Sequence, residues 1–223
     1  IRTDVFSALD RGRKAGPRKS LNMGLDFPAA QAARIWGFTG PNTALNSACS
    51  TGLTSIAYAV NTLRAYPELD AMVVGGSDYT ADAIYMFWFQ SLGALSQGES
   101  IETASCPWDR RRSGFVMGEG AAALVIEPLD RAQARGAYIY AEILSVAEYT
   151  LFDSDTSPDP EGHGAQGAVN LALERAGITA NDIDYVNAHA TSTHVGDDIE
   201  FTAMRALAPG RIMVSNKGQI GHA

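Results

Sequence analysis

The chain has 223 residues, of which 46% are hydrophobic and 19% charged, a balance that is typical of globular proteins and excludes a disordered chain. Acidic residues outnumber basic ones by 25 to 17, for a formal charge of −8, which disfavours a general nucleic-acid binder. The longest apolar runs are far shorter than the ~18 residues of a membrane span, and the two cysteines cannot make a disulfide framework, so we expect a reducing, cytoplasmic setting.

The N-terminal 20 residues are polar, and the chain opens at Ile1 without a methionine or a visible signal peptide. Because it also stops at Ala223, directly after a Gly-His pair, we expect it to be an internal piece of a longer protein. Five bases fall within residues 11–19. They form either a solvated loop face or a docking patch for an acidic partner, chiefly through Arg18 and Lys19.

Apolar patterns in the first half predict a strand, a helix and a second strand. Residues 43–48 are bounded by turn formers, as strands are, and residues 53–63 carry apolar side chains at helical spacing. Pro67 ends that helix. Residues 71–76 form a continuous apolar run closed by glycines, which is typical of a buried strand.

The second half predicts more strands that alternate with helices. Further strands are expected at 121–127, 138–147, 184–187 and 212–215, and helices at 165–176, capped by Gly177, and at 197–207. Residues 150–167 are rich in Asp, Pro, Gly and Ser and predict a surface loop. Buried strands that alternate with helices indicate an α/β layered fold with a largely central sheet.

Cys49 is the first candidate for chemistry, because it lies between a predicted strand and the helix that follows it. At a helix N-terminus the backbone N–H groups and the dipole favour the thiolate, which is the nucleophilic form of cysteine. Small neighbours from Ser47 to Gly52 would let a substrate approach closely. The other interpretation is a buried structural cysteine, the commoner part for a free thiol.

Two further segments place a histidine beside small or hydroxyl residues. Residues 187–193 follow a predicted strand and either present His189 to a cleft or form a turn whose hydroxyls only cap the backbone. Residues 215–222 hold Lys217 and His222 in a loop with two glycines, or form a glycine-rich surface turn. Each segment alone leaves both interpretations open.

Taken together and in order, the motifs resemble the β-ketoacyl synthases, the elongating condensing enzymes of fatty-acid and polyketide synthesis. The segments that carry the resemblance are Asn-Ser-Ala-Cys-Ser-Thr-Gly at 46–52, Asn-Ala-His-Ala-Thr-Ser-Thr at 187–193 and Lys-Gly-Gln-Ile-Gly-His at 217–222. A Pro-Trp-Asp segment that ends in Ser-Gly-Phe-Val, at 107–116, also fits.

The resemblance implies a thiolase-like layered α/β/α/β/α fold, incomplete at both ends. Residues 1–223 would form a partial synthase domain. Within it, residues 1–130 would be the remainder of the N-terminal half, with the nucleophilic cysteine, and residues 131–223 the start of the C-terminal half, with both histidines. The family is normally dimeric, so the resemblance implies a homodimer or a heterodimer with a synthase-like subunit.

It also implies decarboxylative condensation of an acyl-enzyme with malonyl-acyl carrier protein. Cys49 would carry the acyl chain, and neutral His189 and His222 would donate hydrogen bonds to the enolate. Because His222 stands where thiolases have a second cysteine and chain-initiating synthases an asparagine, the resemblance indicates the decarboxylating Cys-His-His type.

Supporting roles follow from the same resemblance. Lys217 and Glu200 would form a buried ion pair that orients the histidines, Thr191 and Thr193 would contact the pantetheine arm, and Phe89 would be a wall of the acyl pocket. The substrates arrive on acyl carrier protein, so no metal or organic cofactor is expected.

Two other functions compete with this interpretation. One is a non-catalytic synthase-like subunit that sets chain length in a heterodimer, and it would be expected to lack the cysteine. The other is a Cys-His hydrolase, which would need water to reach the acyl-enzyme. Acyl loading with and without malonyl carrier protein separates all three.

Overall fold

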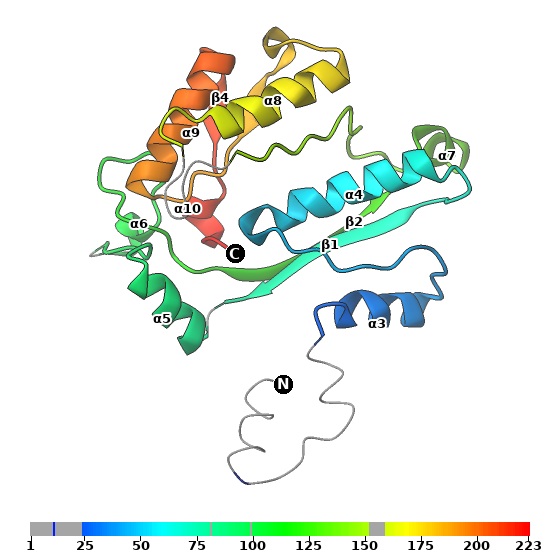
Figure 1. The fold of residues 1–223 in the computed structure, drawn as a ribbon, viewed down its shortest axis with the longest axis horizontal. Helices are drawn as coiled ribbons and strands as arrows, with labels where there is room; N and C mark the ends of the chain where they lie inside the picture. The colour runs from blue at the N-terminus through cyan, green and yellow to red at the C-terminus, as the bar shows by residue number, and fades with distance from the viewer. Residues whose placement is uncertain (1–10, 12–23, 81, 99, 152–158) are drawn as a thin grey trace. The chain divides into compact units, whose positions relative to one another are not determined.

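The computed structural model describes residue 11 and residues 24–80, 82–98, 100–151 and 159–223, and Figure 1 shows their fold. The chain divides into two compact units, residues 1–51 and residues 52–223. Arg18 and Lys19, the expected docking residues, lie outside the described residues.

Among its described residues, the first unit contains the helix α3 (Phe27–Trp36) and the 3₁₀ turn η1 (Ala48–Ser50). α3 ends at Gly37, whose positive φ of 70° lets its N–H donate to the carbonyl of Ala33. The strand predicted at 43–48 is wrong. Polar side chains there bond the local backbone in place of a β ladder, since the N–H of Ala48 donates to the side chain of Asn46.

The second unit begins with the helix α4 (Thr51–Ala65). Thr51, the first residue of this helix, is the last residue of the first unit. Next in the chain come β1 (Met72–Tyr79), α5 (Ala83–Ser91), α6 (Ile101–Ala104), β2 (Glu119–Ile126) and α7 (Leu129–Ala134). β1 and β2 form an antiparallel pair, seen in Figure 1 as a long twisted ribbon. The strands predicted at 71–76 and 121–127 are therefore confirmed.

The expected burial of these strands is wrong, because Val74 is the single buried residue of β1 and β2. A two-stranded ribbon has two open edges, and no further strand pairs with it among the described residues. Apolar side chains such as Val125, which is 63% exposed, therefore remain on its surface.

The remainder of the unit comprises α8 (His163–Ala176), η2 (Ala180–Asp182), β3 (Tyr185–Asn187), α9 (His194–Leu207), β4 (Ile212–Val214) and α10 (Lys217–Ile220). β3 and β4 pair in parallel, and α8 packs on α9. Gly177 caps α8 with a φ of 68°, as predicted. The helices predicted at 165–176 and 197–207 and the last two strands are confirmed, so His189 and His222 both follow regular elements of this unit.

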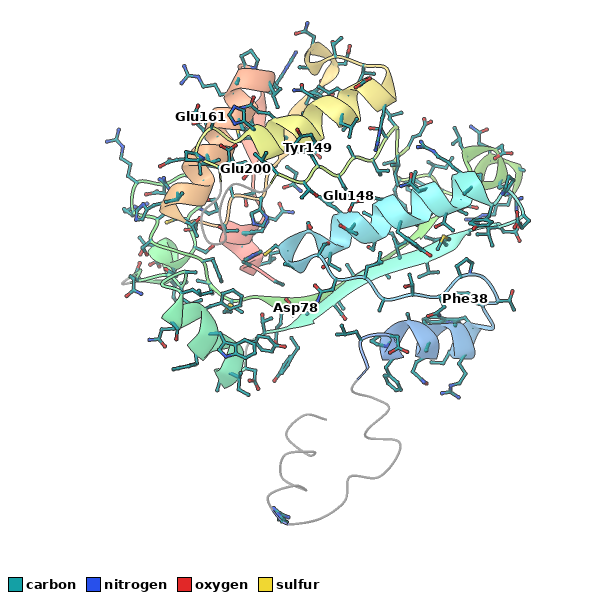
Figure 2. All side chains as sticks on the ribbon, in the orientation of Figure 1. Phe38, Asp78, Glu148, Tyr149, Glu161 and Glu200 are labelled. Carbon is teal, nitrogen blue, oxygen red and sulfur yellow. The ribbon has the colours of Figure 1, made fainter. Side chains whose placement is uncertain are left out.

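The strand predicted at 138–147 is wrong, and residues 137–151 have no regular structure. Side chains hold this segment to neighbouring helices: the hydroxyl of Ser145 donates to the carbonyl of Ala172 in α8, and the hydroxyl of Thr54 in α4 donates to Glu148. Figure 2 labels Glu148 in this segment. The apolar pattern gains no β partner among the described residues, so two separate two-stranded sheets replace the expected central sheet.

The loop predicted at 150–167 is only partly testable, because residues 152–158 lie outside the described residues. Its last residues, from His163 onward, belong to the first turns of α8. Gly162 precedes that helix with a φ of 70° and lies so close to α9 that a Cβ there would meet the Cβ of Ala203 at 2.8 Å.

Candidate active site

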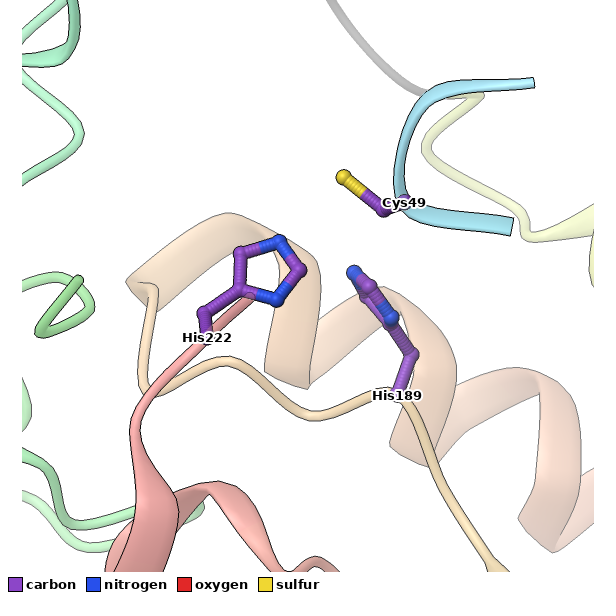
Figure 3. Close-up of side chains that lie close together, drawn as sticks. All are labelled: Cys49, His189 and His222. Atoms are coloured by element: carbon purple, nitrogen blue, oxygen red, sulfur yellow. The ribbon is translucent and has the colours of Figure 1, made fainter. Parts of the chain in front are cut away.

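Cys49 lies in the 3₁₀ turn directly before α4, as predicted, and it is exposed rather than buried. Figure 3 shows its side chain on this turn. The turn is held by its own hydroxyls, since Thr51 Oγ1 accepts from the N–H of Ser47 and donates to the carbonyl of Ala48. Ala48 takes a φ of 51°, which is uncommon for a residue with a Cβ and marks a constrained backbone.

His189 follows β3, and the carboxylate of Glu200 fixes its backbone. The N–H groups of His189 and Ala190 donate to the two carboxylate oxygens of Glu200, at 2.7 and 2.6 Å. Glu200 is half-buried on α9, where Figure 2 labels it. A bidentate contact of this kind sets the direction in which the segment leaves the strand, and with it the place of the imidazole.

His222 follows α10 and is held between two backbone hydrogen bonds. Its N–H donates to the carbonyl of Val116, and its carbonyl accepts from the N–H of Gly118, both at 2.8 Å. His222 and Met117 thus form an isolated parallel β-bridge. The residue is 8% exposed.

The two imidazoles lie edge to face, with ring centroids 5.1 Å apart and an interplanar angle of 88° (Figure 3). Burial, the neighbouring His189 and the cation of Lys217 lower the pKa of His222 to about 4, against a slight opposing effect of Asp78. The pKa of His189 also lies below its usual range, because neighbouring protein desolvates the ring and Lys217 lies near, although the residue keeps access to solvent. Both rings are therefore neutral at pH 7, and each offers one N–H donor.

The lowered pKa of His222 makes stability depend on pH. Between about 4 and 6.5 the unfolded chain binds a proton at this histidine and the folded chain does not. The free energy of unfolding should therefore fall as pH falls through this window. We expect the fall to be smaller in His222→Gln, measured by urea unfolding at several pH values. An equal slope in the wild type and in His222→Gln would contradict the prediction.

The expected ion pair of Lys217 with Glu200 stays a prediction. Both residues are half-buried, and the cation of Lys217 is close enough to lower the pKa of both histidines. The carbonyl of Lys217 also accepts from the hydroxyl of Ser105, which anchors the start of α10.

The predicted substrate residues lie close to the histidine segments. The hydroxyls of Thr191 and Thr193 are 3.2 Å apart, and Thr191 is buried. Phe89 lies in α5, half-buried, with its ring against that of Phe115. Their contacts with substrate stay predictions.

Arg112 and Asp197 form a buried network that the sequence patterns did not predict. Asp197 is fully buried, and its two carboxylate oxygens accept from the N–H groups of Trp108 and Ser192. Both of these residues have positive φ, at 61° and 73°, a conformation that needs such support. Burial raises the pKa of Asp197, opposed by these two hydrogen bonds and by Arg112, whose guanidinium lies 3.8 Å away.

The guanidinium of Arg112 links the Pro-Trp-Asp segment to the segment that contains His189. It donates to the carbonyls of Thr193 and His194 and to the carboxylate of Asp198. The Pro-Trp-Asp segment and the histidine segment are thereby locked together, although more than 80 residues separate them in the chain. The one signal in the sequence was that Arg112 falls inside the Pro-Trp-Asp segment, which resembles the family.

Removing the buried carboxylate should be costly. Asp197→Ala leaves two backbone N–H groups without their acceptor and Arg112 without its buried counter-charge, and we expect a loss of about 3–5 kcal/mol in the free energy of unfolding, measured with urea. Asp198→Ala is the matched control. It removes an exposed partner of the same arginine and should cost less than about 1 kcal/mol. Similar losses in the two variants would contradict the assigned role of Asp197.

Within residues 52–223, no three described His, Cys, Asp or Glu side chains lie close enough together to share a metal ion. None of the helices described has both the length and the apolar character needed to cross a membrane. The expectation that neither a metal nor an organic cofactor is needed stays a prediction.

Comparison with family models identifies both parts of the chain. Residues 7–132 match the model for the beta-ketoacyl synthase N-terminal domain, and residues 140–223 match that for its C-terminal domain. The chain belongs to the beta-ketoacyl synthase family. The resemblance carried by its three motifs is thereby confirmed.

Individual relatives agree with the family. The synthase chain is 37% identical to 3-oxoacyl-[acyl-carrier-protein] synthase 2 of Vibrio cholerae, over 100% of this chain and 55% of the relative. It is 43% identical to the protein of the same name from Staphylococcus aureus, over 88% of this chain and 50% of the relative. It thus spans about half the length of these curated relatives.

Solved structures of ketosynthases have the same fold. A beta-ketoacyl synthase from Burkholderia phymatum matches with a TM-score of 0.85 at 32% identity, over 97% of this chain and 53% of that one. A type II polyketide ketosynthase in complex with its acyl-carrier protein, bound to a hexaketide, matches with a TM-score of 0.88 at 28% identity, over 93% and 52%. The fold of this synthase chain is therefore the predicted thiolase-like α/β fold.

Proposed function

We propose that the protein is a 3-oxoacyl-acyl carrier protein synthase, which joins an acyl-enzyme thioester to malonyl carrier protein with loss of carbon dioxide. The observation that carries this proposal is the edge-to-face pair of neutral imidazoles, His189 and His222, each in its family motif. Two neutral N–H donors placed side by side suit an oxyanion that forms only during reaction.

We propose that Cys49 completes a Cys-His-His triad with these histidines. Its sulfur attacks the acyl thioester, and the carrier's thiol leaves with the proton. The turn before α4 supports this role, because an exposed thiol beside a helix N-terminus suits a nucleophile.

In the second step, His189 and His222 donate hydrogen bonds to the malonyl thioester oxygen. The carbon–carbon bond to the carboxylate breaks and carbon dioxide leaves. The electron pair of the broken bond forms the enolate, whose oxygen these N–H groups stabilise. The enolate carbon attacks the acyl carbonyl, and the sulfur of Cys49 leaves as thiolate. The product is a 3-oxoacyl carrier protein that is two carbons longer.

Four further residues take supporting roles in this proposal. Glu200 holds the backbone of His189, and the cation of Lys217 adds to the burial that lowers the pKa of both imidazoles. The hydroxyls of Thr191 and Thr193 contact the pantetheine arm, and the wall of the acyl pocket includes the ring of Phe89.

We propose acyl carrier protein as the partner, with Arg18 and Lys19 among its docking residues. One similar solved structure is a ketosynthase with its acyl-carrier protein, and another is a ketosynthase/chain length factor. A homodimer or a heterodimer with a synthase-like subunit fits this proposal. Residues 1–130 and 131–223 then contribute the cysteine and the histidines from the two halves of the synthase, in a reducing compartment such as the cytoplasm.

The test is mass spectrometry of the intact full-length protein after incubation with a series of acyl carrier proteins, together with carbon dioxide release from labelled malonyl carrier protein. A covalent acyl adduct and carbon dioxide release are both expected. A chain-length subunit would show no adduct, and a hydrolase would lose the adduct to water without malonyl carrier protein. The retained Cys49 disfavours the first of these alternatives.

A further inference from the structure

Four aromatic rings of the second unit form an unbroken series of edge-to-face contacts. Phe89 meets Phe115 at 5.3 Å and 76°, Phe115 meets His222 at 5.1 Å and 84°, and His222 meets His189 at 5.1 Å and 88°. The series runs from α5, through the segment before β2, to both histidines. Edge-to-face pairs have a preferred geometry, so each ring restricts the rotation of the next.

The backbone of His222 has little freedom of its own. Residues 116–118 and 220–222 cross so closely that a Cβ at Gly118 would lie 2.5 Å from the carbonyl oxygen of Ile220. A Cβ at Gly221, where φ is 72°, would lie 2.9 Å from the carbonyl of Val116. With the backbone fixed, the main freedom left to His222 is rotation of its ring, and Phe115 and His189 both contact that ring.

Phe115 is itself tied to the residues that follow α5. Its N–H donates to the carbonyl of Ala94, its carbonyl accepts from the N–H of Ser96, and its side chain is 7% exposed. α5 also carries Phe89, so the ring and the backbone of Phe115 both connect to this one region. Movement of Phe89 would therefore be passed to Phe115, whose ring contacts that of His222 directly.

We propose that Phe115 is a positioning residue for His222, which aims the imidazole N–H and couples it to the side chain of Phe89. This inference rests on the proposed function. The inference goes beyond that function because it makes His222, the proposed decarboxylating histidine, sensitive to what occupies the space beside Phe89. An acyl chain that displaces Phe89 would then change the orientation of the His222 imidazole through the ring of Phe115.

The first test is Phe115→Leu, which keeps an apolar side chain but removes the flat ring. We expect the kcat of malonyl carrier protein decarboxylation to fall about 10- to 100-fold, since small misplacements of catalytic groups have effects of this size. KM should change less than about 2-fold, because carrier binding is untouched. Phe115→Tyr keeps the ring edge and should restore most of kcat.

Phe87→Leu is the matched control, because it makes the same change on a phenylalanine of α5 that is 66% exposed. It should leave kcat, KM and the titration of His222 unchanged. The coupling itself is tested by a cycle of Phe89→Leu, Phe115→Leu and the double variant. We expect the double variant to be little slower than Phe115→Leu alone, because removing the intervening ring already breaks the connection.

Titration of His222 by NMR is a second readout that does not depend on turnover. Loss of the Phe115 ring admits water, so the pKa of His222 should rise from about 4 toward its usual value. A folded Phe115→Leu protein with wild-type kcat and wild-type His222 titration would overturn the inference. If instead the wild-type protein neither acylates Cys49 nor releases carbon dioxide, the proposed function fails, and an unchanged titration in Phe115→Leu would still overturn the positioning role.

Discussion

Cys49→Ala is expected to abolish formation of the acyl-enzyme, because no other group in the protein is assigned to accept the acyl chain. Decarboxylation of malonyl carrier protein should persist in this variant, since both histidines remain. Intact mass spectrometry after incubation with acyl carrier protein reads the first effect, and labelled carbon dioxide reads the second.

Cys106 provides the control for this prediction. It is half-buried, its Sγ donates to the carbonyl of Thr103, and its N–H donates to the hydroxyl of Ser192. Cys106→Ala should therefore load acyl chains as the wild type does. If peptide mapping found the acyl group on Cys106 alone, the assignment of Cys49 would be wrong.

His222→Ala is expected to slow decarboxylation about 100- to 1,000-fold, the usual effect of removing one oxyanion donor. Acyl loading should be affected far less, because the enolate develops its charge only in the second step. The two rates are separated by single-turnover acylation of Cys49 and by carbon dioxide release from labelled malonyl carrier protein. His189→Ala should show the same asymmetry.

His194→Ala is the matched control, because it removes an exposed histidine at the start of α9. Its two rates should equal those of the wild type. A His222→Ala protein that decarboxylates malonyl carrier protein at the wild-type rate would remove the assigned role. The family would then account for the fold but not for this mechanism.

The three longest helices described, α4, α8 and α9, and the family motifs could be predicted from local sequence, because their signals are local. The apolar spacing of 53–63 and the glycine after 165–176 each report on residues within one helix. Strands need partners, and this is where prediction failed. Residues 138–147 have an apolar pattern like that of 121–127, yet only the latter pair with another strand among the described residues.

The order of the motifs predicted candidate residues for the chemistry, but not the contacts that hold them in place. Asp197 and Arg112 are charged residues in a helix and a turn, and nothing local shows that folding buries them together. Phe115 likewise belongs to a quoted motif, and its contact with His222 joins residues that are distant in the chain. Such contacts depend on the arrangement of several elements, which a single sequence does not display.

The β-bridge between Met117 and His222 affects the order in which this protein folds. More than a hundred residues separate the two positions, and closing a loop of that length costs chain entropy before the contact gives any energy back. Helices α8 and α9 draw on neighbours close in sequence and can form without that closure. We therefore expect His222 to reach its place beside Phe115 among the last events of folding, so a partly folded chain would form the local turn that carries Cys49 well before it positions His222.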